Sequence, residues 1–84
     1  MIVHLVARLE SDGALDIDGF KTGSEASAFI AEKAGEAYDE YLLRHRETEV
    51  DLLVHPYYAR VSVTAAGREC DTVFEYRMLK IEEE

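Results

Sequence analysis

The sequence predicts an α+β domain in which an antiparallel sheet of four to five strands carries one amphipathic helix on one face. Two patterns predict it: short segments in which apolar and polar residues alternate, and one longer segment with helical periodicity between them. The chain has 84 residues, of which 48% are hydrophobic, enough for one small core and too many for a disordered acidic tail. We therefore expect a single domain over residues 1–84 with the element order ββαβββ.

The first two strands form a predicted hairpin. Residues 2–10 alternate between an apolar and a polar face, which is typical of a half-buried strand. The sequence Ser11-Asp12-Gly13 predicts a turn, because Asp and Gly tolerate the positive φ that hairpin turns demand. Leu15 and Ile17 then alternate with acidic residues, which predicts the second strand.

The helix is predicted to run from a capping box at Thr22-Gly23-Ser24-Glu25 to about Arg46. Gly35 inside it costs about 1 kcal/mol relative to alanine, which suggests a packing reason for its presence. At 3.6 residues per turn one broad arc of the helix is apolar, and we expect it to pack on the sheet. The residues of this arc are Ala26, Ile30, Ala34, Ala37, Tyr38, Tyr41 and Leu42.

Three more strands follow the helix. Residues 50–54 alternate, the segment His55-Pro56-Tyr57-Tyr58 interrupts them, and Val61 and Val63 indicate a fourth strand. A turn at Ala66-Gly67-Arg68 leads to a fifth strand from Thr72 to Ile81, whose two faces are both apolar. This last strand is therefore expected either to be covered on both sides or to contain a bulge.

The charge balance limits the function classes. Eighteen Asp and Glu against nine Lys and Arg give a formal net charge of -9, which argues against direct binding to nucleic acid or an anionic membrane. The single cysteine, Cys70, excludes an intramolecular disulfide and a Cys-based zinc site. It fits a reducing cytoplasm. We also expect no signal peptide and no membrane span, because the apolar runs are short and the N-terminus lacks a basic region.

The residues that could support catalysis do not form a known catalytic motif. Cys70 and a histidine could in principle form a thiolate–imidazole pair, and Asp16 and Asp18 lie on one side of a strand where they could bind a divalent ion. In the alternative interpretation, Cys70 is a small residue of a strand, and Asp16 and Asp18 form the solvated face of a hairpin. The histidines have no ligand spacing, and no phosphate loop or nucleophile motif is present. We expect a non-enzymatic protein without a cofactor or a metal. The histidines are His4, His45 and His55.

The most informative feature is the location of the acids on the helix. Five of them share the arc opposite the core arc, and Phe29 and Leu43 fall inside or beside them. Each pair of like charges four residues apart destabilises an isolated helix by about 0.2–0.5 kcal/mol. An arc that carries charges of one sign is therefore less expected of a merely solvated face. A basic groove in a partner would be matched by carboxylates around an apolar anchor. The five acids are Glu25, Glu32, Glu36, Asp39 and Glu40.

Two alternatives explain the same arc. It is an ordinary solvated face, or the acidity reflects a salt-adapted or GC-rich host, since six of the nine basic residues are arginines. Tyr57 and Tyr58 add a second candidate contact, because tyrosine is enriched at interface hot spots. In the alternative interpretation, one of these tyrosines caps the core and the other points outward.

In size, acidity and layout the chain resembles the small acidic inhibitors that phages carry, which include anti-CRISPR proteins and other DNA mimics. The resemblance rests on the capped helix that exposes Glu32, Glu36, Asp39 and Glu40, on the small antiparallel sheet and on the acidic end. It implies a stoichiometric inhibitor that docks on the positively charged nucleic-acid channel of a defence complex.

Two functions remain to be compared with the structure. The first is an acidic protein-interaction module that binds a basic protein or a nucleic-acid-binding complex. The second is a structural module that forms a homodimer through the uncovered sheet face or an edge strand, since one helix covers only one face. A small enzyme or ligand-binding domain is a third and weaker alternative.

Overall fold

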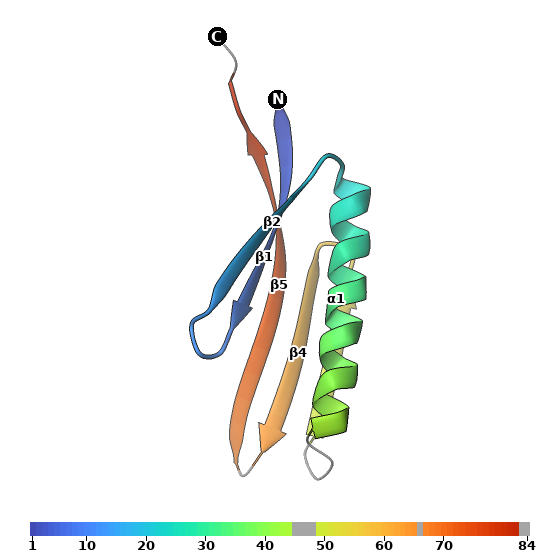
Figure 1. The fold of residues 1–84 in the computed structure, drawn as a ribbon, viewed down its shortest axis with the longest axis vertical. Helices are drawn as coiled ribbons and strands as arrows, with labels where there is room; N and C mark the ends of the chain where they lie inside the picture. The colour runs from blue at the N-terminus through green and yellow to red at the C-terminus, as the bar shows by residue number, and fades with distance from the viewer. Residues whose placement is uncertain (45–48, 66, 83–84) are drawn as a thin grey trace.

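The fold was analysed in a computed structural model that describes residues 1–44, 49–65 and 67–82. These residues form one helix and five antiparallel strands in one sheet, which confirms the predicted fold class and element order (Figure 1). No helix among them is both long and apolar enough to cross a membrane. The elements are β1 (Ile2–Glu10), β2 (Leu15–Phe20), α1 (Gly23–Arg44), β3 (Glu49–His55), β4 (Tyr58–Ala65) and β5 (Arg68–Lys80).

The sheet consists of two hairpins that are joined by the last strand. Its strand order is β2-β1-β5-β4-β3, so β5 lies in the centre. β1 pairs with residues 72–80 of β5, whereas β4 pairs with residues 68–75. The two hairpins therefore overlap along β5 only at residues 72–75. This offset gives an elongated molecule of 55 × 22 × 16 Å (Figure 1).

The predicted turns are present where the described residues test them. Gly13 has a φ of 92°, and the backbone N–H of Ala14 donates to Asp12 Oδ1 at 2.9 Å. Gly67 has a φ of 77° between β4 and β5. Ala66, which the sequence places in the same turn, lies outside the described residues. Both glycines supply a left-handed backbone conformation that other residues adopt at a cost.

The start of α1 confirms the predicted cap. The backbone N–H of Glu25 donates to Thr22 Oγ1 at 3.1 Å, which satisfies one of the free donors of the first turn. Among the described residues no hydrogen bond returns from the Glu25 side chain, so only half of the capping box is formed. The structure describes the helix up to Arg44; the predicted last residues, His45 and Arg46, lie outside the described residues.

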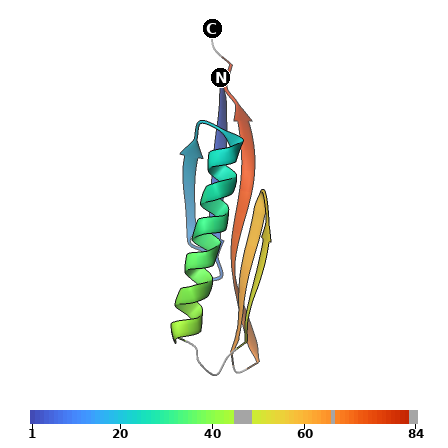
Figure 2. The same cartoon turned by 90° about the vertical axis from the view of Figure 1, so that its right-hand side faces the viewer.

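The core lies between α1 and the helix-facing side of the sheet (Figure 2). Phe74 is its largest fully buried side chain. Tyr38 and Tyr41 are half-buried at its margin, as predicted. Leu42 is 43% exposed, so its prediction as a core residue was wrong: it lies 100° around the helix axis from Tyr41. The fully or almost fully buried core residues are Val6, Ala26, Ile30, Ala34, Ala37, Ala59, Val61 and Phe74.

β5 differs from the prediction in two ways. It begins at Arg68, four residues before the predicted start at Thr72. Its first residues are polar and exposed, and they belong to the strand because they pair with β4. Its register with β1 is unbroken from Thr72 to Lys80, so there is no bulge. Phe74 lies on the helix-facing side, whereas Val73 and Leu79 lie on the side that α1 does not cover. The predicted bulge was therefore wrong, and within the described chain only one side of this strand is covered.

Gly35 has no packing role in the structure. A Cβ built there would have no heavy atom within 4 Å, apart from the local chain, and its φ is not positive. The packing reason suggested by the sequence was therefore wrong.

We predict that Phe74→Ala lowers the free energy of unfolding by about 3–5 kcal/mol, because it leaves a cavity in the core where the two hairpins meet. Met78→Ala, in the same strand but at an exposed position, should change it by less than about 1 kcal/mol. Urea unfolding followed by circular dichroism measures both variants. Equal effects of the two substitutions would contradict this assignment of the core.

We predict opposite effects for two glycine substitutions. Gly35→Ala should raise the free energy of unfolding by about 0.5–1 kcal/mol, because alanine favours the helix and meets open space there. Gly13→Ala should lower it by about 1–2 kcal/mol, because the φ of 92° strains any residue with a Cβ. Thermal and urea unfolding of the two variants measures the signs, and a loss of stability in Gly35→Ala would contradict the open environment.

Candidate functional site

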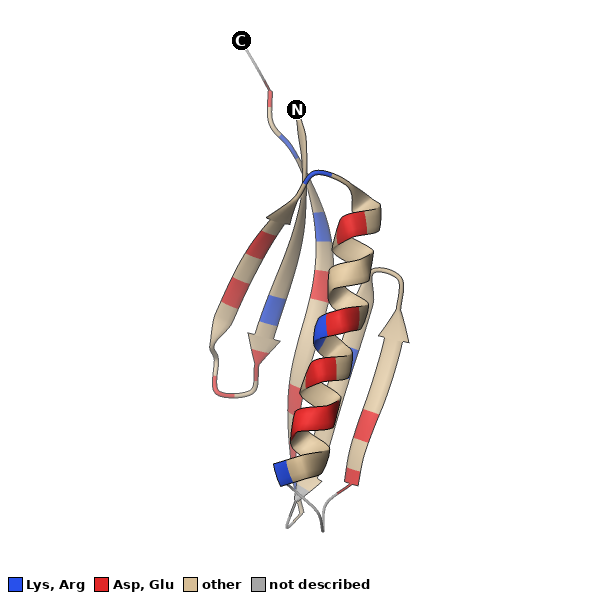
Figure 3. Ribbon diagram, turned by 45° about the vertical axis from the view of Figure 1, so that its right-hand side comes forward, with Lys and Arg blue, Asp and Glu red and all other residues tan. Residues whose placement is uncertain are grey.

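The helix carries an acidic face on the side that points away from the sheet (Figure 3). All five acids predicted for it are exposed, so the structure places them on one surface. They share it because they recur at helical spacing opposite the alanine-rich arc that packs on the sheet. We call these residues the acidic face: Glu25, Glu32, Glu36, Asp39 and Glu40.

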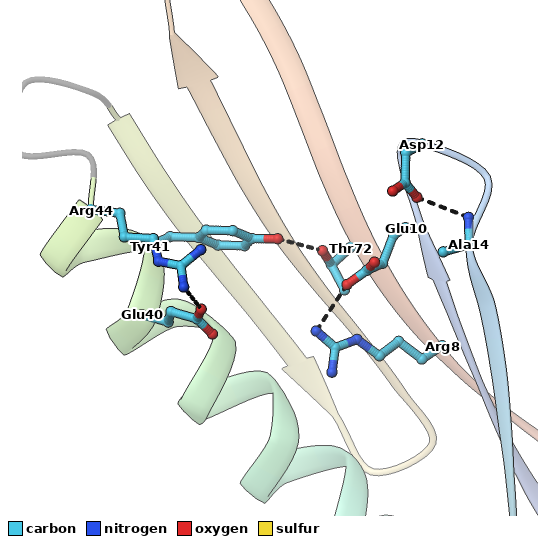
Figure 4. A network of polar contacts seen from close by, with 8 residues as sticks. All are labelled: Arg8, Glu10, Asp12, Ala14, Glu40, Tyr41, Arg44 and Thr72. Atoms are coloured by element: carbon cyan, nitrogen blue, oxygen red, sulfur yellow. Dashed lines mark hydrogen bonds and ion pairs between the residues drawn. The ribbon is translucent and has the colours of Figure 1, made fainter.

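Two of these carboxylates are paired with basic side chains of the same helix. Lys33 Nζ lies 3.1 Å from Glu36 Oε2, and an Arg44 guanidinium nitrogen lies 2.7 Å from Glu40 Oε1 (Figure 4). Such exposed pairs contribute little to stability, and a partner can replace them. Among the ion pairs of the described residues, none involves Glu25, Glu32 or Asp39. The face therefore keeps a net negative charge.

Phe29 is not the exposed anchor that the sequence suggested. It is half-buried against the core, its ring centroid lies 4.9 Å from that of Phe20, and Lys33 Nζ lies 5.7 Å from the ring centroid. The prediction was wrong because this flank of α1 overhangs β2, where Phe20 supplies an apolar partner. Leu43 is 77% exposed beside the acidic face and fits the prediction of a free apolar residue.

A cleft of about 470 Å³ opens between α1 and β2. Asp16 and Asp18 line it from β2, Glu36 lines it from α1, and the half-buried ring of Phe29 contributes apolar surface. Asp16 and Asp18 pair with Arg8 and Val6 of β1, so they lie on the helix-facing side of the sheet. The carboxylates of two separate elements thus surround one opening. Sequence reasoning treated Asp16 and Asp18 as a hairpin face or an ion site and missed this arrangement.

Arg8 and Lys33 also line the cleft, and each is held by neighbours. An Arg8 guanidinium nitrogen lies 3.0 Å from Glu10 Oε1, and Arg8 Cζ lies 5.4 Å from the ring centroid of Phe74 (Figure 4). Arg8 Nε is buried without a recorded hydrogen-bond partner in the described residues. The lining of the cleft therefore combines the carboxylates of Asp16, Asp18 and Glu36 with the cations of Arg8 and Lys33.

Tyr57 and Tyr58 point to opposite sides of the sheet. Tyr57 is exposed, its ring centroid lies 4.7 Å from that of Tyr76, and its carbonyl accepts from the Tyr76 backbone N–H at 3.1 Å. Tyr58 is half-buried and lines a hollow on the side away from the helix. The two tyrosines do not form one surface, and Tyr58 lies on the opposite side of the sheet from the acidic face.

The residues considered for catalysis are far apart. Cys70 pairs with Val63, whereas His4 pairs with Met78, eight residues further along β5 and about 26 Å away. His55 pairs with Tyr58, which lies opposite Glu75, about 17 Å along β5 from Cys70. His45 lies outside the described residues. No group of three or more metal-ligating side chains forms within the described part of the chain.

Comparison of the chain with protein-family models, characterised proteins and solved structures finds no significant match. The resemblance to small acidic phage inhibitors thus stays a prediction from the sequence.

We predict that Phe29 and Leu43 behave differently on truncation. Phe29→Ala should lower the free energy of unfolding by about 2 kcal/mol, because its ring packs on Phe20 and the core. Leu43→Ala should stay within about 0.5 kcal/mol of the original chain, because its side chain is exposed. Chemical unfolding measures both, and a neutral Phe29→Ala would show that Phe29 is a surface residue after all.

Proposed function

We propose that this protein is a non-enzymatic acidic interaction module that docks on the basic groove of a nucleic-acid-binding protein or complex. One observation carries the proposal. Glu36 of the acidic face and the carboxylates of Asp16 and Asp18 on β2 line one cleft on the helix-facing side, and the ring of Phe29 lies in its wall. An arginine or lysine of a partner that enters this opening meets carboxylates from two elements and an aromatic surface.

The spacing of the acids also supports this function. Glu32, Glu36 and Glu40 form a row with a rise of about 6 Å per step, on a helix whose backbone is fixed by its own hydrogen bonds. Fixed carboxylates can occupy a site that is built for phosphates, because such sites present lysine and arginine at close intervals. Leu43 adds an exposed apolar side chain at one end of the row.

Inhibition follows from the same geometry. A partner whose basic groove is filled by the acidic face cannot bind nucleic acid there, so the protein acts as a stoichiometric competitor. This is the form of the function that the resemblance to phage inhibitors implies. The proposal places the protein in the cytoplasm, where the exposed thiol of Cys70 stays reduced.

We predict that the triple substitution Glu32→Gln, Glu36→Gln, Glu40→Gln weakens capture of a basic partner from host lysate by tenfold or more, about the effect of removing three complementary charges. The matched control removes three exposed acids from the strands: Glu49→Gln, Asp51→Asn, Glu69→Gln. Immobilised variants are compared at low and high salt. Capture by the original chain and by the control should fall as salt rises, because the charges are exposed.

The captured partner then provides a direct test of competition. Nucleic acid bound to that partner should be displaced by the original chain and by the control, and not by the triple variant. Equal capture by all three proteins, with the fold intact by circular dichroism, would rule out the acidic face as the docking surface.

A further inference from the structure

The side of the sheet opposite α1 carries an exposed apolar surface. No element of the described chain covers it (Figures 1 and 2). Ile17 is 60% exposed and Leu15 is 57% exposed. Both belong to the apolar face of an alternating strand, and such a face is usually buried. We call this surface the open apolar face. It consists of Leu5, Leu9, Leu15, Ile17, Val73 and Leu79, contributed by β1, β2 and β5.

The open apolar face is neutral in a strongly acidic chain. By strand alternation, the charged side chains among its positions on β1, β2 and residues 73–79 of β5 are Glu75 and Arg77. These two form an ion pair, with 3.0 Å between an Arg77 guanidinium nitrogen and Glu75 Oε2. The surface therefore has no net charge of its own, although the whole chain carries -9. The other acids on this side of the sheet, Glu49, Asp51, Glu69 and Asp71, lie on β3 and on residues 68–71 of β5, outside the open apolar face.

The chain exposes more surface than a compact monomer of its size. Its accessible surface is 6046 Å², about 1,000 Å² more than the roughly 5,000 Å² expected for a compact 9.5 kDa protein. Its radius of gyration is 14.5 Å, against about 12 Å for an average 84-residue domain. A stable dimer buries about 800 Å² on each partner. The offset of the two hairpins gives this elongated shape, and the surplus surface is of the size that one dimer interface would remove.

The shape of the open apolar face also suits contact with a second copy of the same face. A hollow of about 320 Å³ lies over the small side chain of Ala7, with Leu9 and Leu15 on one side and Tyr58 on the other. Protruding leucines and a hollow thus occur on the same surface. In a two-fold symmetric interface each surface meets its own copy, so a leucine of one chain can enter the hollow of the other.

We propose that two copies of this chain associate through the open apolar face to form a sandwich of two sheets. The sheets would pack about 10 Å apart, as in other face-to-face sheet pairs. The helices, with their acidic faces, would then lie on the two outer sides of the dimer. This proposal does not rest on the proposed function, because it uses the opposite side of the sheet.

Salt affects the two proposed interactions in opposite ways: it strengthens the dimer and weakens binding to a basic partner. Each chain carries -9, so two copies repel at long range, and added salt screens this repulsion and strengthens the dimer. Salt weakens the attraction between the acidic face and a basic groove for the same reason. Failure of one proposal is therefore distinguishable from failure of the other.

The test is the mass of the purified protein by sedimentation equilibrium across micromolar concentrations, at low and high salt. The original chain should sediment as a dimer whose dissociation constant falls as salt rises. Ile17→Asp should weaken association by about a hundredfold or more, because two unpaired carboxylates would be buried in each dimer. Met78→Asp is the control: it makes the same change in charge at a 63% exposed position on the other face of the sheet.

Circular dichroism and the amide NMR spectrum of both variants show whether each one folds. A folded, monomeric Ile17→Asp beside a dimeric Met78→Asp supports the proposal. A strictly monomeric original chain at high salt overturns it. A dimer that resists Ile17→Asp, or one that both substitutions weaken equally, overturns it as well, because association would then use another surface.

Discussion

The whole arrangement depends on a short stretch of β5 where the two hairpins meet. Only residues 72–75 pair with both β1 and β4. Phe74 is fully buried there beneath the helix, and the hydroxyls of Thr72 and Tyr41 are 2.8 Å apart in a hydrogen bond from sheet to helix (Figure 4). Arg8 of β1 lies against the ring of Phe74. The helix contacts all five strands. It therefore supports the junction of the two hairpins, which the sheet itself connects only through residues 72–75 of β5.

A single helix on a five-stranded sheet leaves the molecule with two different sides. On the helix-facing side α1 covers the apolar core, and carboxylates point outward from α1 and β2. On the other side, β1, β2 and residues 73–79 of β5 expose apolar residues around the Glu75–Arg77 ion pair, whereas the acids Glu49, Asp51 and Glu69 lie on β3 and at the start of β5. The acidic face of α1 and the open apolar face therefore lie on opposite sides of the sheet, and a basic groove and an apolar sheet are the two different ligands that we propose for them.

The sequence predicted most of the fold, because alternation, turn residues and helical periodicity are local signals. It also placed the five acids correctly on one face. It did not predict the environment of Phe29 or of Asp16 and Asp18, because these depend on which strand lies beneath which flank of the helix. The strand order puts Phe20 under Phe29 and the two aspartates across the cleft from Glu36. The extent of β5 was also missed, since its polar first residues gain their order from pairing alone.

The central position of β5 affects how the chain acquires its structure during synthesis. β1 is complete long before β5 is translated, whereas β4 directly precedes β5, and neither strand can pair across the centre of the sheet without it. Hairpins alone are at best marginally stable in water. The pairing of β1 with β5 joins distant parts of the chain, and such long-range strand pairing slows folding. Until β5 has paired with both β1 and β4, the inner edges of the two hairpins are open to mispairing.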